Sequence, residues 1–211
     1  HHAFALNKHK EVRTKHEKKQ TALLQENNLD PASNKIPKVS PGDALVKMTT
    51  YFGPVYIELY EKADPITVSH FLKYVQSKFY DSIIFHRIID GFVIQAGNYK
   101  TDFSEKDKIA AADTIPFQKN GLKNSLGTIS MARKASNPNS ASTQFFINLA
   151  DNSNLDTTPK FEGYVVFGKV IQGIEIIKKI AKIKIGQREG LHFVPFYPDE
   201  AEIKTLEVVS R

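Results

Sequence analysis

A permanent cation stands inside an apolar stretch of this sequence. Arg87 lies between Phe85 and Ile88 in a run that has the composition of a buried strand. A guanidinium holds its N–H donors in a fixed plane and stays charged at every pH that a folded protein tolerates. Two interpretations are open at this point. Arg87 is either an arginine at a sheet edge, paired with a surface acid such as Asp90, or a donor aimed into a site.

A second stretch, residues 144–149, alternates between two kinds of side chain. Successive side chains of a strand point to opposite faces of the sheet. One face carries three apolar side chains, those of Phe145, Ile147 and Leu149. The other face carries an aromatic ring between two amides, those of Phe146, Gln144 and Asn148. The apolar set belongs in a core, whereas the mixed set suits a surface that holds a peptide. The alternative is that Phe146 is merely an exposed strand aromatic.

Several other kinds of chemistry are excluded by residue type. The chain has no Cys, which rules out disulfides, thiolate catalysis and cysteine-ligated zinc. Residues 151–162 begin and end like a calcium loop, but Leu155 and Asp156 stand where that loop needs a ligand and a glycine. His86 is expected to pack and form hydrogen bonds within the fold, and His70 is expected to be solvated. No metal or cofactor is therefore expected.

The elements that must position these residues indicate a mainly β protein. An alternating run at Val55–Tyr60 follows a strand-like run at Leu45–Thr50 across a turn with Gly53-Pro54, which predicts a hairpin. Asp64-Pro65 opens a predicted helix. Its apolar stripe is formed by Val68, Phe71, Leu72 and Val75. A second helix is expected at residues 173–181.

Short β runs fill most of the remaining sequence. They are expected at residues 83–88, 92–96, 128–132, 144–149, 164–170 and 203–209. Many short strands with only two helices predict a closed eight-stranded antiparallel β-barrel capped by two α-helices.

The chain divides by composition into residues 1–42, a basic N-terminal helical extension with a linker, and residues 43–211, the main domain. The formal net charge is +6, and residues 1–40 hold eight Lys or Arg against four acids. Nucleic-acid binding is not expected, because aromatic residues do not interleave with these charges. The extension is either a tether with a marginal helix or an adaptor for a partner. No run reaches the roughly 18 apolar residues of a membrane span.

The likeness of this sequence to a known family rests on several blocks in order. They are Phe85-His86-Arg87, Gly91-Phe92, Gln95-Ala96-Gly97, Gly127–Ala132, Ser142–Ile147, Asn154–Asp156 and Tyr164–Val170. Through these blocks, over about residues 43–210, the sequence resembles the cyclophilin-type peptidyl-prolyl cis-trans isomerases. The resemblance implies a barrel with a shallow proline-binding groove on its outer surface. Proline-containing peptides and unfolded protein chains are then the expected partners.

The chemistry of such a reaction fits the guanidinium of Arg87. Rotation about the X–Pro bond has a barrier of about 18–20 kcal/mol, because the bond is partly double. In the twisted state the proline nitrogen gains a lone pair, which a fixed cationic donor can stabilise. Lowering the barrier by about 7 kcal/mol would accelerate exchange roughly 10⁵-fold. The other hypothesis is a module that binds proline-containing segments, or a chaperone, with incidental catalysis.

The resemblance also implies roles for individual residues. The catalytic set is Arg87, Gln95 and Phe92, with Gln95 holding the substrate carbonyl. The apolar wall for the proline ring is implied to be Phe92, Val93, Phe146 and Leu155. The groove along the peptide is implied to be lined by Ala132, Arg133 and Gln144, with Tyr164 beside it.

Two positions depart from the pattern of many relatives. Arg133 stands where many carry Asn, which puts a side-chain contact to substrate in doubt and leaves a backbone contact possible. Asn154 stands where the relatives most sensitive to cyclosporin carry Trp, so weak cyclosporin binding is expected.

A few further sequence features bear on the organism and the cellular location of the protein. Tyr164 and the Val194-Pro195 stretch resemble bacterial members of the family. The basic first segment and the absence of an initial Met suit the periplasm, with the cytoplasm as the alternative. A monomer is expected.

Overall fold

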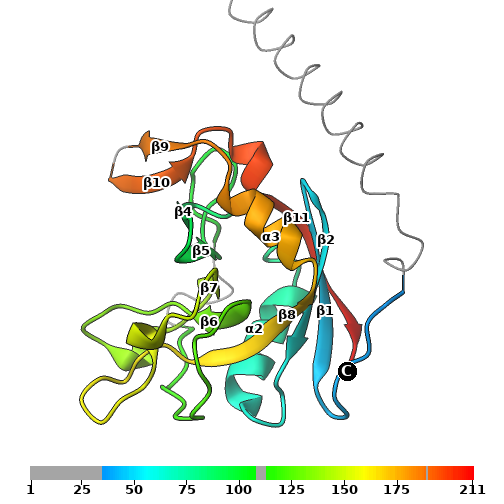
Figure 1. Cartoon of the computed structure of the whole chain (residues 1–211), viewed down its shortest axis with the longest axis vertical. Helices are drawn as coiled ribbons and strands as arrows, with labels where there is room; N and C mark the ends of the chain where they lie inside the picture. Colours follow the sequence, from blue (N-terminus) through cyan, green and yellow to red (C-terminus); the bar gives the residue numbers. More distant parts are fainter. Residues whose placement is uncertain (1–34, 108–112, 189) are drawn as a thin grey trace, which may run out of the picture. The chain divides into compact units, whose positions relative to one another are not determined.

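The computed structural model describes residues 35–107, 113–188 and 190–211. The helix expected in the N-terminal extension lies outside the described residues. The compact unit that contains the sheet spans Pro37–Arg211 (Figure 1). None of the helices in the described ranges is long and apolar enough to cross a membrane.

A single large antiparallel sheet organises this unit. Its nine strands follow one another in space as β3-β11-β1-β2-β8-β6-β7-β5-β4. In chain order the strands are β1 (Ala44–Thr50), β2 (Gly53–Leu59), β3 (Ile83–Ile84), β4 (Arg87–Ile89), β5 (Val93–Ala96), β6 (Thr128–Met131), β7 (Phe145–Asn148), β8 (Val166–Gln172) and β11 (Glu202–Ser210). A separate two-stranded ribbon pairs β9 (Ile185–Arg188) with β10 (Leu191–Pro195).

The predicted barrel type is confirmed, but its strand count and closure are refined. The sheet has nine strands, and its two ends are β3 and β4, which do not pair with each other. They are consecutive pieces of one chain segment: β3 pairs with β11, and β4 pairs with β5. Phe85 and His86 make the crossing, with the amide of Phe85 bonded to the carbonyl of Ala201 and that of His86 to the carbonyl of Gln95. The expected single strand over 83–88 is therefore split between two neighbours.

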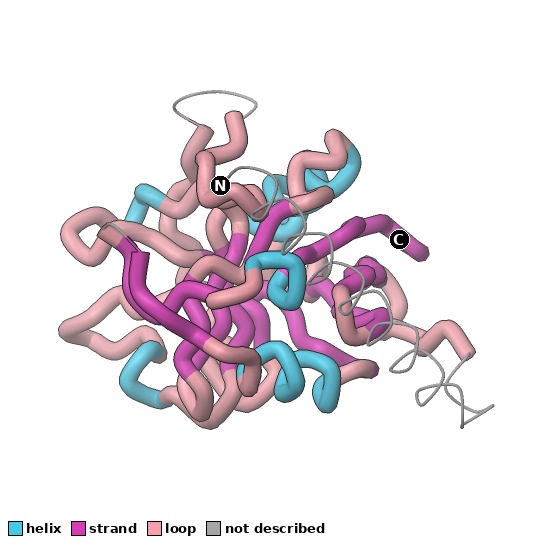
Figure 2. The backbone as a smooth tube through the Cα atoms, turned by 90° about the horizontal axis from the view of Figure 1, so that it is seen from above, coloured by secondary structure: helices cyan, strands magenta, loops and turns pink. Residues whose placement is uncertain are grey.

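Two helices flank the sheet, α2 (Pro65–Gln76) and α3 (Ile174–Ala181), and they lie toward opposite ends of it in Figure 1. The carboxylate of Asp64 caps α2 by accepting a hydrogen bond from the amide of Thr67 at 3.0 Å. The predicted stripe of α2 is buried, as expected. In Figure 2 most helical segments of this unit lie near its rim, and one lies in front of the strands.

Aromatic side chains fill the space between the sheet and α2. The ring of Phe71 lies 5.0 Å from that of Tyr80, 5.5 Å from that of Phe145 and 5.1 Å from that of Phe167. All four residues are fully buried. Close aromatic packing of this kind contributes beyond the area that it buries. The lumen of the sheet is accordingly a packed core.

The first testable prediction concerns Gly97, which follows β5 with φ +115°. A Cβ at this position would lie 2.6 Å from the Cα of Gln144. Gly91 also has a positive φ, +72°, but a Cβ there would meet nothing within 4 Å. We expect Gly91→Ala to lower the free energy of unfolding by roughly 1 kcal/mol, the cost of the left-handed backbone. Gly97→Ala should cost about 3 kcal/mol, because it adds a clash with backbone. Urea unfolding measures both, and equal losses would contradict the account.

Candidate active site

The register of four strands places Arg87 and Gln95 of the predicted catalytic set in one row with Phe146 of the predicted apolar wall, whereas Phe92 lies outside this row. Arg87 on β4 lies opposite Gln95 on β5, Gln95 lies opposite Phe146 on β7, and Phe146 lies opposite Ser130 on β6. Directly opposed residues of an antiparallel pair project to the same face. Arg87, Gln95 and Phe146, which lie 8 to 59 positions apart in the sequence, therefore share one face of the sheet.

The next row of the same strands explains which face this is. Ile88 pairs with Ile94, Ile94 with Ile147, and Ile147 with Ile129. All four isoleucines are fully buried in the core. Side chains alternate along a strand, so the row that contains Arg87 must face outward. Arg87 and Gln95 are half-buried, while Phe146 is 5% exposed.

The Arg87 guanidinium is not held by a surface acid. Asp90, the acid that the sequence offers as its partner, forms an ion pair with Lys182 instead. Within the part of the chain that the structure describes, the side chain of Arg87 has no ion pair and no hydrogen bond. The interpretation of Arg87 as an arginine neutralised by Asp90 is therefore wrong, and its N–H donors remain available.

Gln95, a member of this row, forms a hydrogen bond with a second side-chain amide, that of Gln144. The Nε2 of Gln95 donates to the Oε1 of Gln144 at 2.8 Å. The carbonyl of Gln144 accepts from the amide of Ala132 at 2.9 Å, which joins the ends of β6 and β7. Each side-chain amide keeps a donor or an acceptor that this pair does not use. The structure thus joins Gln95, Gln144 and Ala132, which the resemblance assigns to the site, by hydrogen bonds.

The apolar residues gather on the other side of Phe146. The ring of Tyr164 meets that of Phe146 edge-on at 5.6 Å. The backbone amide of Tyr164 donates to the carbonyl of Leu155 at 2.9 Å. Val93 lies two positions before Gln95 on β5 and therefore on the same face.

Arg133 supports this apolar side. Its Nε donates to the carbonyl of Gly163 at 2.9 Å, and its Nη1 donates to the carbonyl of Lys134 at 3.0 Å. The guanidinium also lies 4.9 Å from the ring centre of Tyr164, within the range of a cation–π contact. The side chain of Arg133 is thus engaged in holding the segment that carries Tyr164. A contact of Arg133 with substrate stays a prediction.

Buried asparagines fix the loops of the site, and sequence analysis missed this role. The Nδ2 of Asn124 donates to the carbonyls of Leu155 and Tyr164, at 3.2 and 3.1 Å. Its Oδ1 accepts from the hydroxyl of Ser130 at 2.7 Å. Asn124 is 2% exposed, so each of these bonds replaces one that water would otherwise make.

A second pair of asparagines extends this network to Phe92. Asn152 donates to the carbonyl of Phe92 at 2.9 Å and to the Oδ1 of Asn148 at 2.8 Å. Asn148 donates in turn to Thr128 Oγ1 and Asn124 Oδ1. The prediction that Asn148 forms a polar edge of the peptide surface is wrong, since its side chain is buried and these bonds occupy it. No local spacing links Asn124 to the other two, because it lies 24 positions from Asn148, and the partners of the three asparagines come from separate strands and loops.

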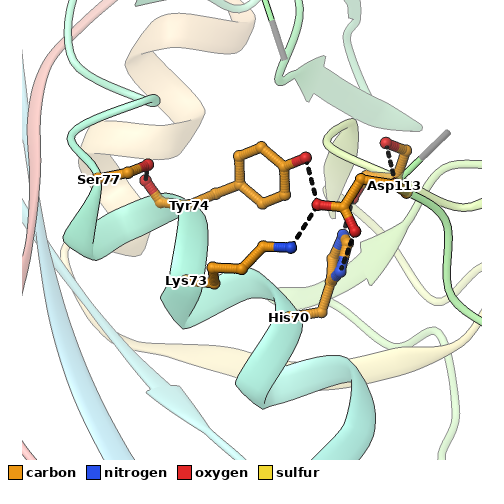
Figure 3. A network of polar contacts seen from close by, with 6 residues as sticks. His70, Lys73, Tyr74, Ser77 and Asp113 are labelled. Atoms are coloured by element: carbon orange, nitrogen blue, oxygen red, sulfur yellow. Dashed lines mark hydrogen bonds and ion pairs between the residues drawn. The ribbon is translucent and has the colours of Figure 1, made fainter. Parts of the chain in front are cut away.

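The prediction that His70 is solvated is also wrong. His70 is 8% exposed, and its Nε2 donates to the carbonyl of Ser142 at 2.8 Å. Figure 3 shows His70, Lys73 and Tyr74 of α2 directed at the carboxylate of Asp113. Burial opposes the charge of Asp113, but hydrogen bonds from Lys73 and Tyr74 hold the pKa of Asp113 below its usual value. This cluster ties α2 to the chain two residues before Gln144.

His86 is a poor candidate for proton transfer. It is 5% exposed, and its ring lies 4.7 Å from that of Tyr99. Its buried Nδ1 finds no hydrogen-bond partner among the described residues. Burial, assisted by the charge of Arg87, lowers the pKa of His86 to about 4. The ring is therefore neutral near pH 7. The prediction that His86 packs inside the fold is confirmed, whereas its Nδ1 lacks the expected hydrogen bond within the described residues.

The second testable prediction follows from this pKa. In the unfolded chain His86 takes up its proton near pH 6.5, but in the folded chain it does so only near pH 4. The unfolded state binds more protons between these values, so stability falls as the pH falls through this window and levels off below it. His86→Gln should remove up to about 3 kcal/mol of this fall, measured by urea unfolding between pH 4 and 7. His192→Gln, at an exposed ring, is the control. An unchanged slope in His86→Gln would contradict the assignment.

Known proteins share both the sequence and the fold of this chain. The family described as cyclophilin type peptidyl-prolyl cis-trans isomerase/CLD matches residues 45–198. A peptidyl-prolyl cis-trans isomerase of Acinetobacter baylyi is 45% identical over 171 residues, which cover 80% of this chain and 89% of the relative. Peptidyl-prolyl cis-trans isomerase B of Escherichia coli is 38% identical over 152 residues, covering 70% of this chain and 90% of that protein.

Solved structures give the same result. A cyclophilin-type isomerase of Cryptosporidium parvum has a TM-score of 0.63 and 26% identity, over 80% of this chain and 99% of that one. A second structure of that protein, in the presence of the dipeptide Ala-Pro, has the same TM-score. The family match covers most of the chain and agrees with the sheet and the row of residues described above. This chain therefore belongs to the cyclophilin-type peptidyl-prolyl cis-trans isomerases.

Proposed function

We propose that this isomerase works by directing the guanidinium of Arg87 at the nitrogen of a proline that rests against Phe146. The observation that carries the proposal is the row in which Arg87, Gln95 and Phe146 lie on adjacent strands and share the outward face. Adjacent strands are about 4.8 Å apart, so a short peptide can contact all three side chains at once.

Each member of the row has a part in this mechanism. In this proposal the ring of Phe146, together with Phe92, Val93 and Leu155, offers an apolar wall to the proline ring. The amides of Gln95 and Gln144 offer hydrogen bonds to the peptide backbone on either side. Arg87 supplies a donor that becomes effective only when the amide is twisted and the nitrogen regains its lone pair. An interaction that strengthens in the transition state raises the rate rather than the affinity.

The surroundings of Arg87 favour this use. With Asp90 paired to Lys182, no carboxylate competes for the guanidinium within the described residues. The neighbouring His86 is neutral near pH 7, so Arg87 is the cation that a substrate meets at this point. Preorganised donors of this kind cost little reorganisation when the transition state forms.

Proline-containing peptides and unfolded chains are the proposed substrates. The Cryptosporidium parvum relative was solved in the presence of Ala-Pro, which supports this class of ligand. A bacterial source, a periplasmic location, the monomeric state and the role of residues 1–42 stay predictions from the sequence.

The third testable prediction concerns Arg87. Arg87→Ala should lower kcat for a four-residue Ala-Ala-Pro-Phe peptide by about 100- to 1000-fold, because it removes a donor used in the transition state. The Kd for the same peptide should change much less, and isomer exchange followed by NMR measures both quantities. Arg211→Ala is a matched control, because Arg211 is exposed and pairs with Glu61. If wild type binds the peptide and leaves its exchange rate unchanged, the chain is a proline-binding module instead.

The fourth testable prediction concerns cyclosporin. Asn154 lies in the short helix η4 (Ser153–Leu155) and is exposed. Asn154→Trp adds an indole donor and an apolar surface next to Leu155, so it should tighten cyclosporin binding by about tenfold or more. Calorimetric titration of wild type and variant measures the difference. Asn154→Phe adds the apolar ring alone and separates the two contributions. Tight binding by wild type would contradict the expectation.

A further inference from the structure

One short segment carries half of the large hydrophobic side chains that are exposed in the described residues. They are Ile185, Phe193, Phe196 and Tyr197, with exposed fractions of 40%, 45%, 53% and 38%. All the Phe and Tyr residues in that exposed set lie here, on or directly after the ribbon β9–β10. A gathered patch of exposed aromatics indicates an interaction site more strongly than scattered apolar residues do.

The backbone of Phe193 shows that its exposure is built into the ribbon. Phe193 has φ +59°, and the register between β10 and β9 shifts between His192 and Val194. Val194 and Pro195, which follow it, are buried. A bulky residue in the left-handed region is strained, and a bulge re-aims the side chain that it carries. Asn would fit this backbone better than Phe, so folding alone does not account for the ring.

Two cations of the ribbon contact aromatic rings, one within this exposed set and one outside it. The Nζ of Lys184 lies 4.1 Å from the ring centre of Phe196, and the guanidinium of Arg188 lies 4.5 Å from that of Phe103. Residues 182–200 contain three Lys or Arg and three acids, and Lys182 pairs with Asp90, so the cations beside the rings are Lys184 and Arg188. The surface therefore presents apolar rings and positive charge together, which is complementary to acidic and aromatic side chains.

The ribbon adjoins the strand that carries Arg87. β10 lies against β4, which forms the end of the large sheet (Figure 1). The ion pair between Lys182 and Asp90 fastens the base of the ribbon to the turn that follows β4. A peptide bound across Arg87 can therefore continue onto the ribbon. An extended stretch of about ten residues spans roughly 33 Å, which is ample for both regions.

We propose that Ile185, Phe193, Phe196 and Tyr197, together with Lys184 and Arg188, form a second contact surface for the substrate chain. This ribbon surface binds acidic and aromatic side chains of a flexible polypeptide whose proline occupies the site at Arg87. The inference rests on the proposed function of that site. It gives the enzyme a preference for long, unfolded substrates with such residues near the proline.

The test compares three peptides that share the core Ala-Ala-Pro-Phe. One is the core alone, one is extended on both sides by about five residues containing Glu and Phe, and one is extended equally with Gly and Ser. Wild type should favour the Glu/Phe peptide over the Gly/Ser peptide by about tenfold in kcat/KM, through KM. The double variant Phe193→Asn, Phe196→Ser should lose this preference and keep its activity on the core. Its thermal midpoint should stay equal or rise, because Asn relieves the strain at position 193.

The control variant removes exposed apolar side chains elsewhere. Ile66→Ser with Ile171→Ser, on α2 and β8, should leave the preference intact. Fluorescence anisotropy of the labelled peptides gives Kd independently of turnover. If wild type fails to turn over the core peptide, the proposed mechanism at Arg87 is wrong. The ribbon proposal is then tested separately: wild type should still bind the Glu/Phe peptide with a Kd about tenfold lower than that of the Gly/Ser peptide.

Three results would overturn the proposal. The first is a wild type that treats both extended peptides alike. The second is a ribbon variant that weakens all three peptides equally, since that would make the ribbon a structural support. The third is displacement of the labelled Glu/Phe peptide by oligouridine at lower concentration than by unlabelled peptide, which would assign the surface to nucleic acid.

Discussion

The antiparallel register of β4, β5, β7 and β6 is the constraint on which the rest of this structure depends. The register places four isoleucines in one row and Arg87, Gln95 and Phe146 in the next. Burying the isoleucine row fixes the face that each strand turns to the core, because a slip by one residue would exchange the two faces. The same hydrophobic burial that stabilises the sheet therefore holds Arg87, Gln95 and Phe146 outward and on adjacent strands.

Polar groups behind the site secure the loops that the sheet does not reach. Asn124 and Asn152 hold the carbonyls of Leu155, Tyr164 and Phe92, and Asn148 joins the two asparagines. Buried amides are costly unless they are bonded, so this network favours one arrangement of the three loops over its alternatives. The loops that carry the proposed apolar wall thus depend on hydrogen bonds, whereas the row of Arg87, Gln95 and Phe146 depends on apolar packing.

Hydrogen bonds and close packing also act together around Gln144. His70 and Tyr80 hold the carbonyls of Ser142 and Thr143, the two residues before it. Gly97 packs against the backbone at the same point, where no larger residue fits. Helix α2 and the segment after it therefore hold the backbone that leads into Gln144. On the other side of Arg87, the ribbon β9–β10 extends the surface with rings and cations that the core does not require.

The sequence by itself determined the local features of this protein. Period-two alternation predicted the faces of Phe145, Phe146 and Ile147, and Asp64-Pro65 marked the start of α2, because both depend on residues close together in the chain. The resemblance of the motif blocks indicated the family. Only the tertiary structure decided that Asp90 pairs with Lys182, 92 positions away, and that Asn148 and His70 are buried. It also decided that one strand-like segment divides into β3 and β4. These outcomes depend on partners from distant segments, which no local pattern encodes.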